Sequence, residues 1–512
     1  MFLRLSTAAF FRYVGLVRSR YARFFYYVHR HQLITHGGLN RRRTCIDILD
    51  DDSLLNIFYL YRLPVLLEEG DSGDIALWGG RWEWEDWWYK LASVCRRWRY
   101  LILASPSYLG ISLVCRSLTP MADMLAHSPH FPLVINHFPP EHRKTTTQVK
   151  EGILLALKQR DRVRRIRLQM HDPPSIGFVE ALDEEFPLLE YLHIQSQMVR
   201  NTNLSLPSTL RAPRLRHLVL HGFTFPIGSP SLAGLVTLSF ECKPSANFGP
   251  NTLLQQLSLM PHLETFKISF HSTFTNMHVE RQLFRIPLST YVTLPSLRWF
   301  GFEGPSAFIG IILPRMTMPL LKVTEIASTT SDLRNLATSI PLALRSMCET
   351  ESPRLYAVKV AFYDENMVVT MHPHKQDSMP TLRLRLLRSN PTAGLECMAQ
   401  VFHLTREVFT EVASLTFEDK TSWVLHRRFA IHASWHELLR PFNQVRTLRV
   451  SGGDLIEVLS LSLLPIDGES AIGLLPMLGV LSCPKGSQVG ESCVLFLDTR
   501  RNAGFPVTIS HH

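Results

Sequence analysis

A short motif that recurs from about residue 160 onward constrains the fold of this chain more than any other feature. The motif is Pro-x-Leu-x-x-Leu-x-Leu or a close variant, as in residues 213–220, PRLRHLVL. Copies that begin with proline start at Pro187, Pro213, Pro261, Pro295, Pro319, Pro353 and Pro476. Copies without the proline have their first apolar residue at Val163, Leu235, Val412 and Val445. The last x-Leu-x-Leu of each copy alternates with a period of two residues, which predicts a short strand with its leucines on one face.

One such unit cannot fold alone, because a single short strand has nothing to cover its apolar face, so the units must stack. The proline disfavours helix at the residue before it and marks a turn into the strand. Successive first anchors are 20 to 34 residues apart, except for an interval of 57 residues between Leu355 and Val412. These spacings are near or somewhat above those of leucine-rich repeats, which the pattern resembles.

The repeats predict the class and the extent of the main domain. We predict an α/β fold in which an irregular leucine-rich-repeat-like solenoid occupies residues 161–500. The long interval predicts an irregular insert near residues 366–408. The alternative is a scatter of apolar strands in an ordinary α/β domain.

Two apolar segments nearer the N-terminus are predicted to be helical. The first, residues 49–58, has three acids and then apolar residues, which fits a helix whose start is capped by Asp50 or Asp51. The second segment has one apolar stripe at helical spacing, made by Leu91, Val94, Cys95 and Trp98. Cys95 is expected to be a small buried hydrophobe in that stripe.

Together the two segments resemble the F-box, a small helical module that binds the Skp-type adaptor of cullin-RING ubiquitin ligases. The resemblance covers about residues 46–113, and its Val-Cys-x-x-Trp-Arg centre is similar to F-box proteins of mushroom-forming fungi. It departs from the family pattern at Asp50, where proline usually stands, and in an acidic, Trp-rich insertion over residues 62–88. The resemblance implies that seven residues pack the module or face the adaptor: Leu49, Leu54, Leu55, Ile57, Phe58, Val94 and Trp98. The alternative is that both helices are core elements of a larger helical domain.

The net charge of +10 comes almost entirely from the N-terminus. Nine arginines and no acid precede Asp47, and the rest of the chain has 45 basic against 44 acidic residues. We therefore do not expect nucleic-acid binding. Residues 1–43 are interpreted as a basic arm, either disordered or a mitochondrial targeting segment. Between the helical module (residues 44–115) and the solenoid we expect a connecting region over residues 116–160.

The sequence contains no pattern typical of an active site. It has no Gly-x-Gly-x-x-Gly, Walker A loop, Gly-x-Ser-x-Gly or His-Glu-x-x-His motif, so we expect no enzyme activity and no cofactor. The eight cysteines include no Cys-x-x-Cys pair, which argues against a metal site or a disulfide framework and favours the cytoplasm or nucleus. No apolar run approaches the roughly 18 residues typical of a membrane span.

The resemblance therefore implies a substrate-recognition adaptor of a Skp–cullin–F-box ubiquitin ligase. Its partners would be the Skp-type adaptor, the cullin-RING core and a client protein held by the solenoid. The alternative is an interaction scaffold outside the ubiquitin system. Residues beside the inner leucines are expected on the client-binding face, and the candidates are Arg165, Arg167, Tyr191, His193, His217, Lys267, Trp299 and Lys359. They suggest a mildly basic face suited to an acidic or phosphorylated client segment, unless they are ordinary solvated strand positions.

Overall fold

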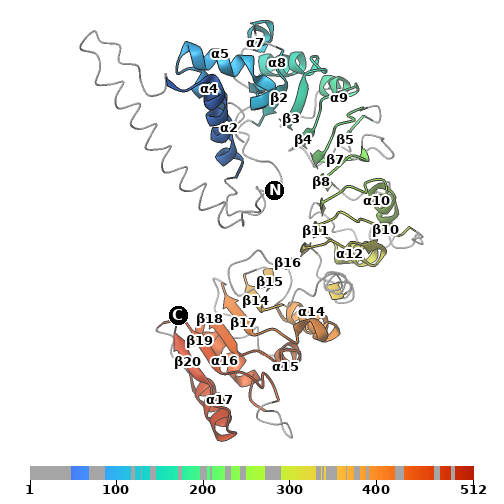
Figure 1. Cartoon of the computed structure of the whole chain (residues 1–512). Helices are drawn as coiled ribbons and strands as arrows, with labels where there is room; N and C mark the ends of the chain where they lie inside the picture. Colours follow the sequence, from blue (N-terminus) through green and yellow to red (C-terminus); the bar gives the residue numbers. More distant parts are fainter. Residues whose placement is uncertain are drawn as a thin grey trace. The chain divides into compact units, whose positions relative to one another are not determined.

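The computed structural model describes residues 48–67, 87–116, 121–127, 130–138, 146–170, 176–196, 204–207, 210–224, 232–242, 249–270, 290–329, 336, 340–341, 355–364, 366–373, 381–387, 391–420, 432–465, 473–485 and 490–511. The basic arm and residues 68–86 of the predicted insertion lie outside these ranges. The chain divides into two compact units, Met1–Asn136 and His137–His512, each treated separately below (Figure 1).

The first unit is a small helical module followed by two parallel strands. Its elements are α2 (Asp51–Leu67), α4 (Trp87–Ala92), α5 (Arg96–Ala104), α6 (Pro106–Leu109), β1 (Leu113–Arg116), α7 (Met121–His127) and β2 (Leu133–His137), whose last residue belongs to the second unit. The ring of Phe58 on α2 packs edge-on against Trp98 on α5, with centroids 4.9 Å apart. Trp88 on α4 is buried and donates its indole N–H to the carbonyl of Ser112, 3.1 Å away, which ties the helices to β1.

The predicted single apolar stripe through Val94 and Cys95 is wrong, because the chain breaks between α4 and α5. Cys95 has an extended backbone, and its Sγ accepts a hydrogen bond from Trp98 N at 3.5 Å, so it caps α5. Both Val94 and Cys95 are exposed. The apolar spacing correctly predicted that Leu91 and Trp98 are buried. Between these two residues, however, α4 ends and the Cys95 cap begins α5.

The boundaries predicted around this module also differ from the structure. Helix α2 continues to Leu67, well into the predicted insertion, and Trp87 and Trp88, the last residues of that insertion, begin α4. The predicted connecting region contains regular structure, namely α7, β2 and helix α8 (Thr147–Leu157). Acidic and turn-forming residues alone therefore misplaced the element ends, which depend on packing.

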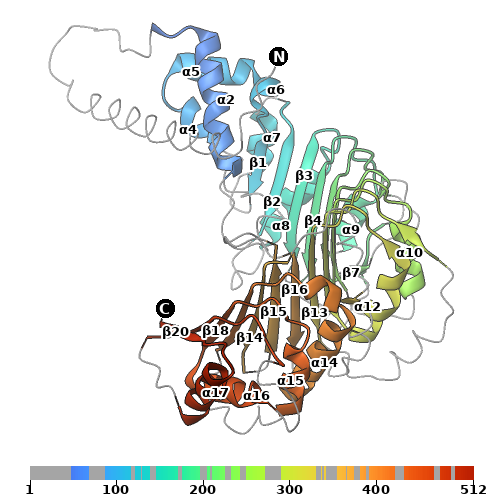
Figure 2. The ribbon, with the colours of Figure 1, turned by 60° about the horizontal axis from the view of Figure 1, so that its bottom comes forward.

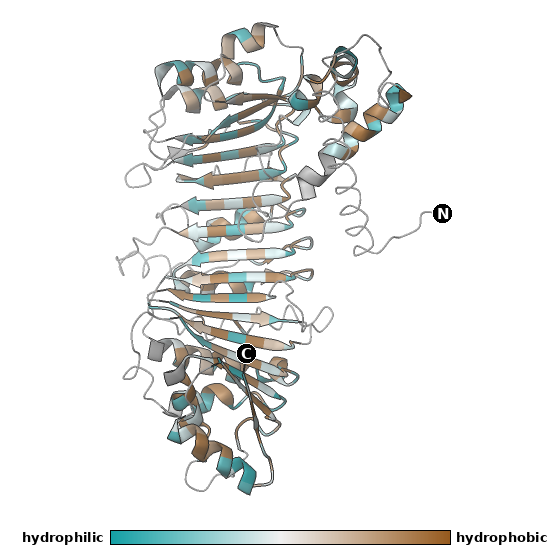
Figure 3. Cartoon of the chain, turned by 90° about the vertical axis from the view of Figure 1, so that its left-hand side faces the viewer, coloured by the Kyte–Doolittle hydropathy of each residue, from teal (hydrophilic) through white to brown (hydrophobic). Residues whose placement is uncertain are grey.

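The second unit is an α/β structure built on one long, mostly parallel sheet, consistent with the predicted leucine-rich-repeat-like solenoid. Its strands pair in the order β3-β4-β6-β8-β9-β11-β13-β16-β15-β14-β17-β18-β19-β20. These strands are β3 (Val163–Met170), β4 (Tyr191–Ser196), β6 (His217–His221), β8 (Thr237–Cys242), β9 (Thr265–Phe270), β11 (Trp299–Gly304), β13 (Val323–Ser328), β14 (Ala357–Phe362), β15 (Asn366–His372), β16 (Leu382–Leu387), β17 (Ser414–Asp419), β18 (Thr447–Ser451), β19 (Val480–Cys483) and β20 (Thr508–His511). Figure 3 shows them side by side.

Helices connect many of these strands and cover one face of the sheet (Figure 2). They are α9 (Ile176–Leu182), α10 (Pro250–Leu257), α12 (Ser306–Ile312), α14 (Pro391–Leu404), α15 (His432–Leu439), α16 (Gly453–Ser462) and α17 (Glu491–Asn502). The shorter elements are the 3-10 helices η4 (Leu313–Arg315) and η5 (Arg406–Phe409), the strand pair β5 (Leu204–Ser205) and β7 (Phe223–Thr224), and the pair β10 (Val292–Thr293) and β12 (Met316–Thr317).

The core lies between these helices and the sheet, as the period-two leucine pattern requires. Strand β9 alternates half-buried and buried residues along its whole length. The buried set includes Phe270, whose ring lies 4.7 Å from Phe308 on α12. In the same way Trp435 on α15 packs against Phe417 of β17, with centroids 5.2 Å apart. The other face of the sheet, which we call the open face, carries the alternate residues.

The segment predicted to be an irregular insert contributes regular strands to the sheet. Strand β15 is antiparallel to both of its neighbours, β14 and β16, whereas β16 is parallel to β13. Two strands are thus inserted between β13 and β14, which are consecutive repeat strands in the sequence. Residues 391–404 then form α14. The long interval between repeats therefore marks added strands, and the period-two pattern of Leu382, Leu384 and Leu386 was a signal for one of them.

Candidate functional site

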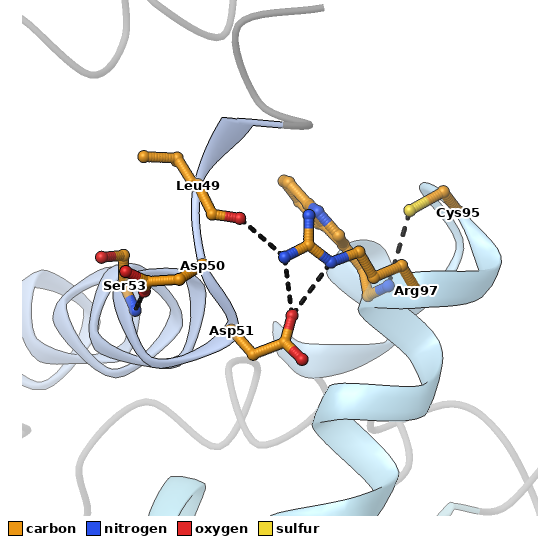
Figure 4. Close-up of polar contacts among 7 residues, drawn as sticks. Leu49, Asp50, Asp51, Ser53, Cys95 and Arg97 are labelled. Carbon is orange, nitrogen blue, oxygen red and sulfur yellow. Dashed lines mark hydrogen bonds and ion pairs between the residues drawn. The ribbon is translucent and has the colours of Figure 1, made fainter. Parts of the chain in front are cut away.

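The start of α2 is held by two sets of polar contacts in the helical module (Figure 4). Asp50 Oδ1 accepts a hydrogen bond from Ser53 N at 2.7 Å, which confirms the predicted acidic cap and lowers the pKa of Asp50. Arg97 on α5 bonds Asp51 Oδ1 through Nη2 at 2.6 Å and through Nε at 3.0 Å. Arg97 Nη2 also donates to the carbonyl oxygen of Leu49 at 2.6 Å. The two halves of the F-box-like pattern, distant in sequence, are therefore joined at this point.

The seven predicted adaptor-binding residues separate into two groups in the structure. Leu54, Phe58 and Trp98 are almost fully buried and pack the module. Leu49, Leu55 and Ile57 are half-buried, and Val94 is 48% exposed. A partner of the module would therefore contact the second group, and the first group would act by holding the helices together.

Aromatic residues that the sequence patterns did not single out also lie on the module surface. Tyr108 on α6 donates its hydroxyl hydrogen bond to Asn56 Oδ1 at 2.7 Å. Its ring lies 5.5 Å from Tyr59, and both rings are exposed, as is Tyr100. Tyr59 and Tyr108 lie on different helices, so only the packing of α2 against α6 shows that they are neighbours.

The predicted client-binding residues of the first strands form a cluster on the open face. Arg165, Tyr191 and His217 are partners across β3, β4 and β6, and Arg167 is paired with His193 in the next row. The His193 ring lies 5.4 Å from that of His221 and 5.2 Å from that of Phe138. The guanidinium of Arg167 stacks 3.8 Å from the centroid of Phe138. Phe138, which sequence patterns did not single out, thus covers part of this cluster.

Burial sets the electrostatics of this cluster. Burial, with the nearby His221 and Arg167, lowers the pKa of His193 to about 3, and burial raises the pKa of Tyr191 to about 12. His193 Nε2 is buried and has no hydrogen-bond partner. The pKa of His217 is also lowered, chiefly by burial. His221 Nδ1 lies 2.7 Å from Glu241 Oε2. His193, a predicted client-binding residue, is therefore a buried imidazole that burial keeps neutral, beside Arg165 and Arg167.

The predicted aromatic anchor Trp299 also differs from expectation, because it is only 4% exposed. A Cβ atom at Gly301 would lie 2.4 Å from the Trp299 ring and 3.3 Å from Lys267. Glycine at 301 therefore lets the indole lie flat on the open face beside Lys267. Trp299 therefore forms part of the floor of the open face and does not project from it as the predicted anchor would.

The later strands of the open face carry more exposed charges. Lys359 of β14 lies 2.7 Å from Glu418 Oε1, and Lys420 lies 3.0 Å from Glu418 Oε2. Although burial raises it, hydrogen bonds from both lysines bring the pKa of Glu418 below its ordinary value. Arg383 of β16 lies 3.8 Å from Glu325, and Arg449 of β18 is exposed. Arg383 was missed because its strand was interpreted as an insert.

Two absences among the described residues concern metal sites and membrane spans. Within those residues, no group of three or more His, Cys, Asp and Glu is arranged to hold a metal ion. None of the helices described there is long and apolar enough to span a membrane. The candidate surfaces built from the predicted residues are the module surface around α2 and α5 and the open face of the second unit.

Comparison with known proteins adds little to this description. No protein-family model matches the chain, and no curated protein matches it. Among solved structures, the leucine-rich repeat-containing protein LegL7 from Legionella pneumophila is similar at 10% identity, over 67% of this chain and 99% of that one. Its TM-score of 0.27 is too low to support a conclusion about fold or function.

Proposed function

We propose that this chain is a substrate-recognition adaptor of the Skp–cullin–F-box type. The helical module would bind the Skp-type adaptor, and the open face of the second unit would bind a client protein. The chain itself would perform no chemistry, because its contribution would be to hold the client near the ubiquitin-loaded enzyme.

One observation carries the proposal: the two F-box-like segments pack on each other through Phe58 and Trp98 while Val94 stays exposed beside them. The Arg97 contacts to Asp51 and Leu49 hold the start of α2 against α5. A buried core with an exposed apolar residue next to it suits a module whose surface binds another protein.

The client surface is proposed on separate grounds. Among the described elements, helices cover one face of the repeat sheet, and the opposite face carries cations from several strands together with the Trp299 floor. A basic, partly aromatic surface on a rigid sheet favours an acidic protein segment as its partner.

Co-expression with a Skp-type adaptor tests the adaptor proposal. We expect the full chain to co-purify with the adaptor and the Val94→Asp variant to lose most of this binding, because a charge replaces an exposed apolar contact. Leu259→Asp is the matched control, since Leu259 is 47% exposed on the second unit and Val94 is 48% exposed. If the wild-type chain does not bind the adaptor, the ligase role is wrong, and the chain is better described by the alternative, an interaction scaffold outside the ubiquitin system.

A further inference from the structure

Strand pairing aligns basic residues from separate repeats into one row on the open face. From β16 to β18 the paired residues of this row are Arg383, Thr370, Lys359, Thr416 and Arg449. Cations and threonines therefore alternate on five neighbouring strands. All five side chains are exposed or half-buried, so the row faces solvent.

Two acids lie beside these cations. Glu325 of β13 is the register partner of Arg383 and stands at the end of the row, whereas Glu418 pairs with Ala361 in the adjacent row. The Arg383–Glu325 separation of 3.8 Å is long for an ion pair, and Lys359 shares Glu418 with Lys420. Within the described residues Arg449 takes part in no ion pair. The row consequently keeps a positive charge that the sheet does not fully neutralise.

The spacing of these cations matches an extended peptide. Neighbouring strands are about 4.8 Å apart, so cations on alternate strands are about 9.6 Å apart. An extended chain in the polyproline II conformation has three residues per turn and rises about 3.1 Å per residue, so every third residue returns to the same side after about 9.3 Å. A peptide that runs across the strands would thus bring residues i, i+3 and i+6 over the three cations.

We propose that this row, Arg383, Lys359 and Arg449, binds an extended acidic segment of a client protein with carboxylates at i, i+3 and i+6. The threonines at positions 370 and 416 would contact the intervening backbone. The inference rests on the proposed role of the open face as the client surface. It adds the direction of the bound segment, its charge and the spacing of its acidic residues.

Peptide binding to the full chain tests the spacing directly. The probes are two fluorescein-labelled glycine–serine peptides of equal length and composition, one with three aspartates at every third position and one with three contiguous aspartates. We expect the spaced peptide to bind about tenfold more tightly, because only it can use three exposed charge pairs at once. Its affinity should fall as salt is raised, since exposed pairs are screened.

The row itself is tested by charge removal. The triple variant Arg383→Gln, Lys359→Gln, Arg449→Gln should lose the preference for the spaced peptide. The matched control is Lys158→Gln, Arg440→Gln, Arg501→Gln, which removes the same net charge from helical regions away from the open face. Circular dichroism of both variants checks that the sheet is intact, and the control should bind the spaced peptide like the wild type.

Three results would overturn the inference: equal binding of the two peptides, an unchanged preference in the folded triple variant, or tighter binding of a single-stranded oligonucleotide of equal charge. The adaptor pull-down is run on the same preparations. The pull-down depends on the helical module and not on the row. If the chain binds the adaptor but shows no peptide preference, only this inference is overturned. If the wild-type chain does not bind the adaptor, the proposed ligase role is overturned instead.

Discussion

The helical module and the repeat sheet are stabilised in different ways, although both bury aromatic residues. In the module, the main aromatic contact between α2 and α5 is that of Phe58 with Trp98, which are about forty residues apart in the sequence. In the sheet, similar contacts recur from repeat to repeat, such as Phe240–Phe266 at 6.0 Å and Phe266–Phe300 at 5.8 Å. A small core depends on each large side chain, whereas a stacked array distributes its stability among neighbouring units.

From this comparison we expect the largest effect on folding from a substitution in the core of the helical module. Trp98→Ala should cost about 3–5 kcal/mol, enough to unfold a module this small and to abolish adaptor co-purification. Hydrogen exchange of α2 and α5 should become fast, while the protection of β3 to β19 stays unchanged. Slow exchange in α2 of this variant would show that the module has more support than the Phe58–Trp98 contact.

The equivalent substitution in the sheet should have a local effect. Trp435→Ala removes a fully buried indole that packs on Phe362 and Phe417, also at a cost of about 3–5 kcal/mol. We expect faster exchange in α15, β14 and β17 only, with adaptor binding retained. Global unfolding of the second unit would contradict the distributed stability of the array.

A smaller effect is expected in how the stability of the sheet changes with pH. The pKa of His193 is about 3 in the folded chain against an ordinary value of 6.5, so the unfolded chain binds a proton more readily between these values. Stability from the neutral, buried His193 is therefore complete above pH 6.5 and is lost as the pH falls toward 3. His193→Leu should weaken this loss in chemical denaturation between pH 7 and pH 4. An NMR titration of the wild type checks the cause, since His193 should remain neutral at pH 5.

The smallest effect is expected at the surface of the module. Arg97 and Asp51 are partly exposed, with side-chain exposures of 37% and 58%, so Asp51→Asn should cost only about 0.2–1 kcal/mol. Arg97→Ala should cost more than Asp51→Asn, because it also removes the hydrogen bond to the Leu49 carbonyl. Thermal melts of the two variants provide the comparison, and equal destabilisation would show that the carbonyl contact contributes nothing.

Much of the fold was predictable from local patterns. The alternating leucines identified the repeat strands, because one residue in two must enter the core of a sheet covered on one face. The acidic start of α2 identified its cap, since Asp50 needs only a backbone N–H three residues away. The spacing of Phe58 and Trp98 on apolar stripes likewise marked them as large core residues.

Only the tertiary structure decided which residues of different elements are neighbours. The break at Cys95, the burial of His193 and Trp299, and the insertion of β15 and β16 all depend on contacts that the sequence pattern does not contain. The row of Arg383, Lys359 and Arg449 is the clearest example, because its strands are not paired in sequence order. Hydrophobic periodicity is a property of one strand, whereas the neighbours of a charge are set by the register between strands.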